Sequence, residues 1–142
     1  GFIHIYKEPQ GELIKTISLR NELKNDDYEI KRILITPTWG LILVQTEGIL
    51  TVFDINGTFV HSIKFTEPIL NWYGFTDFHL FDYVVFENEQ HKIGFFDPLD
   101  ENSVQYFYEA MERTPLITFD PLTNCFIFLS ENKQITFVPK PC

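Results

Sequence analysis

A short strand-like pattern recurs four times along the chain at nearly constant intervals. Each occurrence is a run of β-branched, aliphatic and aromatic residues, and the four runs begin at Ile3, Leu50, Ile93 and Ile135. Successive runs are separated by 47, 43 and 42 residues. A period of about 40–45 residues, with four short strands in each repeat, is typical of β-propeller blades. This recurrence limits the possible folds more than any single motif in the chain.

The clearest hairpin lies in the segment from Gly48 to His61. An apolar run there is followed by Asn56-Gly57, and a second apolar run begins at Phe59. We expect a two-residue turn at Asn56-Gly57, because such a turn needs positive φ angles and Asn-Gly adopts them readily. Apolar runs also precede the aligned strands at Leu50, Ile93 and Ile135 by six or seven residues, so the local order is repeated.

The composition favours an all-β chain, because aromatic residues make up 16% of it and 15 of them are Phe. We therefore predict a single domain of β-propeller blades, each with four antiparallel strands, and about three and a half blades in total. The predicted units are a blade remnant in 1–20, blades in 30–65 and 69–108, and a partial blade in 114–140. A β-sandwich with regular hairpins is the alternative, although it does not predict a recurring pattern at fixed spacing.

A propeller ring closes with about four to eight blades, and an open array exposes strand edges and an apolar blade face. We therefore expect the chain either to be a piece of a longer propeller or to complete a ring with another chain. In the second case, the chain is predicted to associate with itself to complete the ring.

The charge balance narrows the classes of partner. The chain has 11 basic and 20 acidic residues and a net charge of −9, which disfavours nucleic acid and anionic lipid surfaces. It has no apolar run of about 18 residues, so we expect no membrane span. Two cysteines, Cys125 and Cys142, are too few for a disulfide framework, which favours a reducing, cytoplasmic location. Asn56-Gly57-Thr58 matches the N-glycosylation sequon, but we interpret it as the hairpin turn.

The residues that carry chemistry do not form a known catalytic or metal-binding motif. His4, His61, His79 and His91 lack metal-ligand spacing, and the chain contains neither a nucleophile elbow nor a phosphate-binding glycine loop. We therefore predict no catalytic residues, no cofactor and no metal, and a protein that is not an enzyme.

Five aspartates form the basis of the alternative hypothesis, a propeller enzyme or glycan-binding module. In this hypothesis the five carboxylates converge at the mouth of the propeller ring, as paired carboxylates do in glycosidases. Two of them precede proline, which is typical of turns and favours a structural role. The five are Asp77, Asp82, Asp97, Asp100 and Asp120.

Four aromatic residues are candidate protein-interface anchors: Trp39, Trp72, Tyr106 and Tyr108. Large aromatic side chains carry much of the binding energy in protein interfaces. The competing interpretation of the two tryptophans is packing between blades. If Val104, Tyr106 and Tyr108 share one face of a strand, that face is expected to be exposed and adhesive.

Two aligned strands end in Phe-Asp, at Phe53-Asp54 and Phe96-Asp97, where WD repeats carry Trp-Asp, so the repeat resembles a degenerate WD40 blade. The upstream Gly-His of that family is not evident. The segment ITPTWGLI at 35–42, followed by VFDING at 52–57, is similar to the C-terminal WD repeats of BEACH-domain (beige-like) proteins.

The resemblance implies a non-catalytic scaffold within a large cytosolic protein of vesicle or lysosome traffic, peripheral to membranes through that parent protein. We accordingly predict a protein-interaction module with protein partners. A self-assembling half-propeller is a further hypothesis.

Overall fold

Every regular element of the described chain is a β-strand. The computed structural model describes residues 2–7, 11–18, 30–46, 48–76 and 82–141, and no helix long and apolar enough to cross a membrane occurs among them. The strands of these residues, in chain order, are β1 (Phe2–Lys7), β2 (Glu12–Ser18), β3 (Arg32–Ile35), β4 (Ile42–Gln45), β5 (Ile49–Phe53), β6 (Phe59–Lys64), β7 (Ile69–Thr76), β8 (Asp82–Asn88), β9 (Lys92–Phe96), β10 (Gln105–Glu109), β11 (Leu116–Asp120), β12 (Cys125–Leu129) and β13 (Ile135–Pro139).

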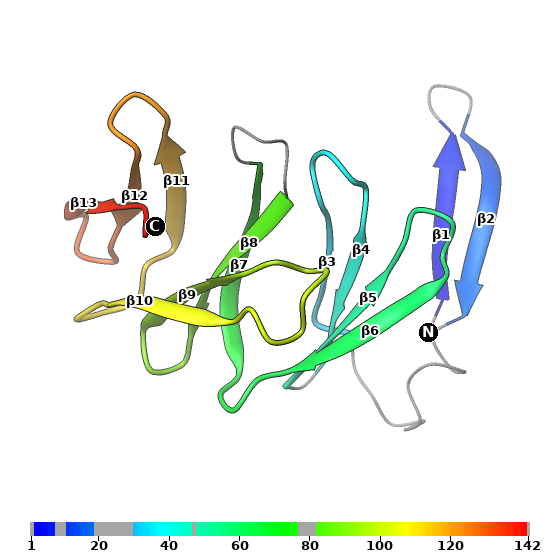
Figure 1. The fold of residues 1–142 in the computed structure, drawn as a ribbon, viewed down its shortest axis with the longest axis horizontal. Helices are drawn as coiled ribbons and strands as arrows, with labels where there is room; N and C mark the ends of the chain where they lie inside the picture. The colour runs from blue at the N-terminus through cyan, green and yellow to red at the C-terminus, as the bar shows by residue number, and fades with distance from the viewer. Residues whose placement is uncertain (1, 8–10, 19–29, 47, 77–81, 142) are drawn as a thin grey trace.

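These strands form four antiparallel sheets in which neighbouring strands are consecutive along the chain. Sheet I contains β1–β2, sheet II β3–β6, sheet III β7–β10 and sheet IV β11–β13. The sheets follow one another across the molecule, from the N-terminal side to the C-terminal side (Figure 1). The predicted all-β fold with four-stranded antiparallel sheets is confirmed. The described array is open, which is consistent with a partial propeller and with the alternative of a sandwich.

The second strand of each four-stranded sheet is buried on both faces. In β4, Ile42 and Val44 pack toward Ile3 of sheet I, whereas Leu43 packs toward Trp72 of sheet III. Alternate residues of a strand point to opposite faces, so one apolar run serves two interfaces.

The same arrangement is repeated in β8. Val84 and Phe86 join the cluster shared with sheet II, and Tyr83 and Val85 join the cluster shared with sheet IV. One apolar cluster therefore lies at each boundary between neighbouring sheets.

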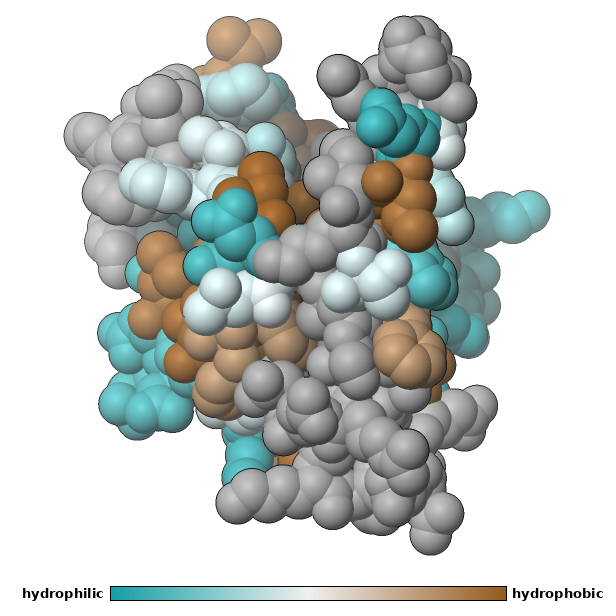
Figure 2. All heavy atoms as spheres, turned by 90° about the vertical axis from the view of Figure 1, so that its right-hand side faces the viewer, coloured by the Kyte–Doolittle hydropathy of each residue, from teal (hydrophilic) through white to brown (hydrophobic). Residues whose placement is uncertain are grey.

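The two outer faces of the array expose apolar side chains. Leu116, Ile135 and Phe137 are exposed on sheet IV, and Phe2 and Tyr6 are exposed on sheet I. Figure 2 views the sheet I side, where brown apolar side chains lie among white and teal ones. The outer faces of the first and last described sheets are therefore partly apolar.

The hairpin between β5 and β6 differs from the prediction of a two-residue turn. The Asp54 N–H donates to the Thr58 carbonyl, so the loop is longer, and Gly57 alone in it has a positive φ, of 79°. The Asp54 carboxylate accepts hydrogen bonds from the N–H groups of Asn56 and Thr58, both at 2.9 Å. This side chain favours a longer turn with one left-handed glycine, because it satisfies two backbone donors within the loop.

Gly94 provides a test of the packing within sheet III. A Cβ at this position would lie 2.8 Å from the Gln105 carbonyl oxygen and 2.8 Å from Phe86 Cζ, whereas at Gly74 the nearest atoms would be 3.4 Å away. We expect Gly94→Ala to lower the free energy of unfolding by about 1–3 kcal/mol through overpacking. Gly74→Ala, the matched control, should change it little. Urea unfolding of both variants measures the difference, and equal stabilities would contradict the packing described.

Candidate protein-interaction surface

The four aromatic interface candidates lie in different environments. Trp39 is 53% exposed in the turn between β3 and β4, and Tyr106 is 43% exposed on β10. Tyr108 is half-buried on the same strand. Trp72 is 0% exposed, because it packs in the cluster between sheets II and III. Its burial leaves no exposed ring for a partner to contact and favours the alternative interpretation of Trp72 as a packing aromatic.

Tyr106 and Tyr108 do not share a face of β10. The pairing with β9 shifts register between them, since Tyr106 lies opposite Gly94 and Tyr108 opposite Ile93. Such a bulge inserts an extra residue and changes which side chains face each way. The centroid of the Tyr106 ring lies 5.5 Å from that of Phe86. The centroid of the Tyr108 ring lies 5.3 Å from that of Phe128, on the sheet IV side. The predicted adhesive face of Val104, Tyr106 and Tyr108 is therefore not formed.

The Trp39 turn is held in place by a carboxylate from the neighbouring sheet. The Thr38 N–H donates to both carboxylate oxygens of Asp82 at 3.0 Å, and the Trp39 N–H donates to Oδ2 at 2.6 Å. Asp82 begins β8 and is buried, so these charge-assisted bonds are partly shielded from water. The bonds fix the backbone that carries the Trp39 ring.

The turn is also closed by its own hydrogen bonds. The buried Thr36 hydroxyl accepts from the Leu41 N–H at 2.9 Å, and the Thr36 N–H donates to the Leu41 carbonyl at 3.0 Å. Gly40 has a φ of +67°, which favours glycine. These contacts leave little conformational freedom in the backbone on either side of Trp39.

Two exposed isoleucines lie close to the turn that carries Trp39. Ile35 precedes the turn, and the Ile55 side chain lies over Gly40, with Cδ1 3.2 Å from where a Cβ would be. Both isoleucines are exposed. We name Ile35, Trp39 and Ile55 the Trp39 patch. Sequence reasoning missed the isoleucines, although an isoleucine within the polar turn at 54–58 was an available signal.

The carboxylates of the alternative hypothesis serve turns and sheet contacts in the described chain. The Asp97 carboxylate accepts from the Leu99 N–H, the Asp100 carboxylate from the Asn102 N–H, and the Asp120 carboxylate from the Leu122 N–H. Asp82 binds the Trp39 turn, and Asp77 lies outside the described residues. The structural interpretation of these aspartates accounts for the contacts observed.

The described histidines contact different partners. His4 hydrogen-bonds Thr16, and His61 Nε2 lies 2.6 Å from the Pro98 carbonyl oxygen. His91 Nδ1 lies 3.6 Å from the buried Glu87 carboxylate. His79 lies outside the described residues. Among the residues that are described, no group of three or more His, Cys, Asp or Glu side chains is placed to hold a metal ion.

Glu87 joins sheet III to the chain that enters sheet IV. Its carboxylate accepts from the Thr114 N–H at 2.8 Å and from the Asn71 side-chain amide at 3.3 Å. Nearby, the Tyr73 hydroxyl donates to the Pro115 carbonyl. Burial raises the pKa of Tyr73 and Glu87 adds to the increase, whereas Arg32 and Arg113 act in the opposite direction.

The fold is similar to two solved structures of computationally designed proteins, Ika4 and Ika8. The superposition on Ika4 has a TM-score of 0.66 at 13% sequence identity and covers 99% of this chain and 81% of that one. The superposition on Ika8 has a TM-score of 0.60 at 13% identity and covers 92% of this chain and 37% of that one. No protein-family model and no curated protein sequence matches the chain. At these identities the likeness concerns the fold alone.

The Asp82 contact to the Trp39 turn can be tested by substitution. Asp82→Asn keeps the shape but replaces one acceptor oxygen with a donor, so we expect a loss of about 1–3 kcal/mol in the free energy of unfolding. Hydrogen exchange at the Thr38 and Trp39 amides should also become faster.

Asp100→Asn is the matched control, because this exposed carboxylate accepts a single local bond. It should change stability by less than about 0.5 kcal/mol. Unchanged exchange at Trp39 in Asp82→Asn would show that the carboxylate does not hold the turn.

Proposed function

We propose that the protein is a non-catalytic protein-interaction scaffold and that the Trp39 patch contacts a protein partner. The observation that carries this proposal is an exposed tryptophan on a backbone fixed by the Asp82 carboxylate. Interface hot spots are enriched in tryptophan, and a rigid anchor loses little conformational entropy on binding. Ile35 and Ile55 add exposed apolar area near the turn.

The resemblance to the WD repeats of BEACH-domain proteins supports the proposal on separate grounds. The resembling segments, 35–42 and 52–57, include all three residues of the Trp39 patch. We place the protein in the cytosol, as a WD40-like segment of a larger protein that acts in vesicle or lysosome traffic. In this proposal the partner is a protein, and neither nucleic acid nor direct membrane insertion is involved.

Affinity capture from cell extract with matched variants tests the function. Trp39→Ala should reduce capture of the specific partners by about tenfold or more, because hot-spot truncations cost about 2 kcal/mol. Leu122→Ala is the control, since Leu122 is 94% exposed in a turn outside the patch. Binding of each captured protein is then measured with purified components. If wild type and Trp39→Ala bind the same proteins equally, the patch is not the interaction site.

Self-association is a second candidate, favoured by the exposed apolar side chains on sheets I and IV. Light scattering across a concentration series should then give the mass of a defined dimer. Phe137→Glu should shift the mass toward the monomer, because a charge would be desolvated in the contact. Leu122→Glu should leave the mass unchanged. A wild-type monomer at every concentration would exclude this candidate.

A further inference from the structure

Sheet IV has one strand fewer than sheets II and III in the described chain. Its order is β11-β12-β13, so β13, at the C-terminal end of the array (Figure 1), pairs with β12 on one side and with no described strand on the other. The runs that begin at Leu50, Ile93 and Ile135 show that β13 corresponds to β5 and β9, the third strands of the four-stranded sheets. In those sheets a fourth strand, β6 or β10, pairs with the edge that β13 leaves open.

The register of β13 determines which of its backbone groups face the open edge. The Lys140 N–H donates to the Asn124 carbonyl, which precedes β12, at 3.0 Å. Hydrogen-bonded and non-hydrogen-bonded pairs alternate along an antiparallel ladder. The N–H and C=O groups of Ile135 and Phe137 therefore point away from β12, toward the open edge. Pro139 is the next outward residue and has no N–H, so it ends this row of donors.

The equivalent edges that are paired show which residues such an edge takes. An aliphatic or aromatic residue lies opposite the first residue of the repeated pattern, as Ile63 lies opposite Leu50. A polar residue lies opposite the residue two positions further, as His61 lies opposite Val52. Sheets I and III follow the same rule, with the pairs Ile17 and Ile3, Lys15 and Ile5, Tyr108 and Ile93, and Gln105 and Phe95.

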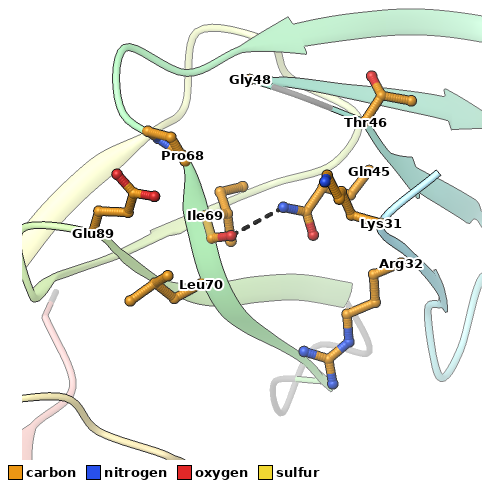
Figure 3. Close-up of a pocket in the computed structure, with 9 residues that line it drawn as sticks. All are labelled: Lys31, Arg32, Gln45, Thr46, Gly48, Pro68, Ile69, Leu70 and Glu89. Atoms are coloured by element: carbon orange, nitrogen blue, oxygen red, sulfur yellow. Dashed lines mark hydrogen bonds between the residues drawn. The ribbon is translucent and has the colours of Figure 1, made fainter. Parts of the chain in front are cut away.

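The side chains beside the open edge are apolar. Leu129 lies opposite Ile135, at the place that Gln45 occupies in sheet II. Gln45 Nε2 donates to the Ile69 carbonyl of the following sheet at 3.1 Å (Figure 3), whereas the Leu129 side chain is apolar. Ile135 is 64% exposed and Phe137 is 58% exposed. An aliphatic side chain opposite Ile135 would extend the apolar row that Leu129 begins, and such cross-strand pairs stabilise a sheet.

We propose that the open edge of β13 binds an extended segment of a partner protein as an added antiparallel strand. In this segment a polar residue lies opposite Phe137, and an aliphatic residue two positions further along lies opposite Ile135. Backbone hydrogen bonds supply the affinity of such strand addition, and alternate side chains supply its selectivity. A second copy of β13 fits less well, because pairing centred on Thr136 would place Ile135 opposite Phe137, with no polar residue at either position.

The open edge of β13 belongs to sheet IV, whereas the Trp39 patch belongs to sheet II. The proposal therefore does not depend on the patch, and each can fail without the other. Trp39→Ala should leave strand addition at β13 unchanged.

Titration of the ¹⁵N-labelled protein with a capped peptide of the β6 sequence, Phe-Val-His-Ser-Ile-Lys, tests the proposal. We expect the amide signals of Ile135 and Phe137 to shift at millimolar peptide concentrations. Methylation of the peptide's isoleucine nitrogen should weaken binding about tenfold, because it removes a donor that faces β13. Methylation of the serine nitrogen is the matched control and should have little effect, because that N–H faces away. Equal effects of the two methyl groups, or no binding, would overturn the proposal.

Two variants at one position separate the backbone of β13 from its side chain. Phe137→Pro removes the outward N–H, which β12 does not use, and proline is tolerated at such edge positions. We expect this variant to bind the peptide about tenfold more weakly than Phe137→Ala, which keeps the N–H. Equal binding by two folded variants would contradict strand addition. If Phe137→Pro does not fold, the methylated peptides decide the question without a protein variant.

Light scattering distinguishes a partner segment from a second copy at the same edge. A monomer that binds the β6 peptide supports the proposal. A dimer that is lost in Phe137→Pro, is kept in Phe137→Ala and is dissociated by the peptide would show that β13 pairs with β13 of a second copy. That result would overturn the assignment of the edge to a partner segment.

Discussion

Burial of a single strand on both faces is the constraint on which the rest of the structure depends. β4 and β8 each present alternate side chains to two different apolar clusters. Neither strand can therefore bury its apolar side chains within its own sheet alone. Each sheet is therefore stabilised by its neighbours, and the array forms by side-to-side packing. Stability in such a structure is close to a sum of sheet and interface contributions.

Polar contacts supplement this packing at both ends of the sheets. At one end, Asp82 binds the Trp39 turn of the preceding sheet, and at the other, Gln45 and Glu87 bind the chain that enters the following sheet. Buried polar groups need partners, and here the partners come from the adjacent sheet. One of the contacts that align the sheets also determines the position of the Trp39 patch.

The strands and their grouping were predictable because a period of about 40–45 residues and alternating apolar runs are signals in the sequence itself. The exposure of Trp39 and the burial of Trp72 were not predictable, because burial depends on which sheet packs against each residue. The Asp82 contact joins residues 44 positions apart, so no local pattern reports it. The bulge between Tyr106 and Tyr108 likewise changed the face of one tyrosine, and β10 itself contains no glycine or proline that marks it.

Gln45 and Glu87 occupy equivalent positions, since each pairs with the residue that begins the repeated pattern, Leu50 or Ile93. One is neutral and bonds a carbonyl, whereas the other is charged and bonds an amide. The two repeats are therefore not interchangeable. A duplicated copy of sheet III followed by a segment without the Thr114 amide would bury an uncompensated carboxylate. Lengthening this array by gene duplication would consequently require a compensating change at position 87 or in the segment that follows.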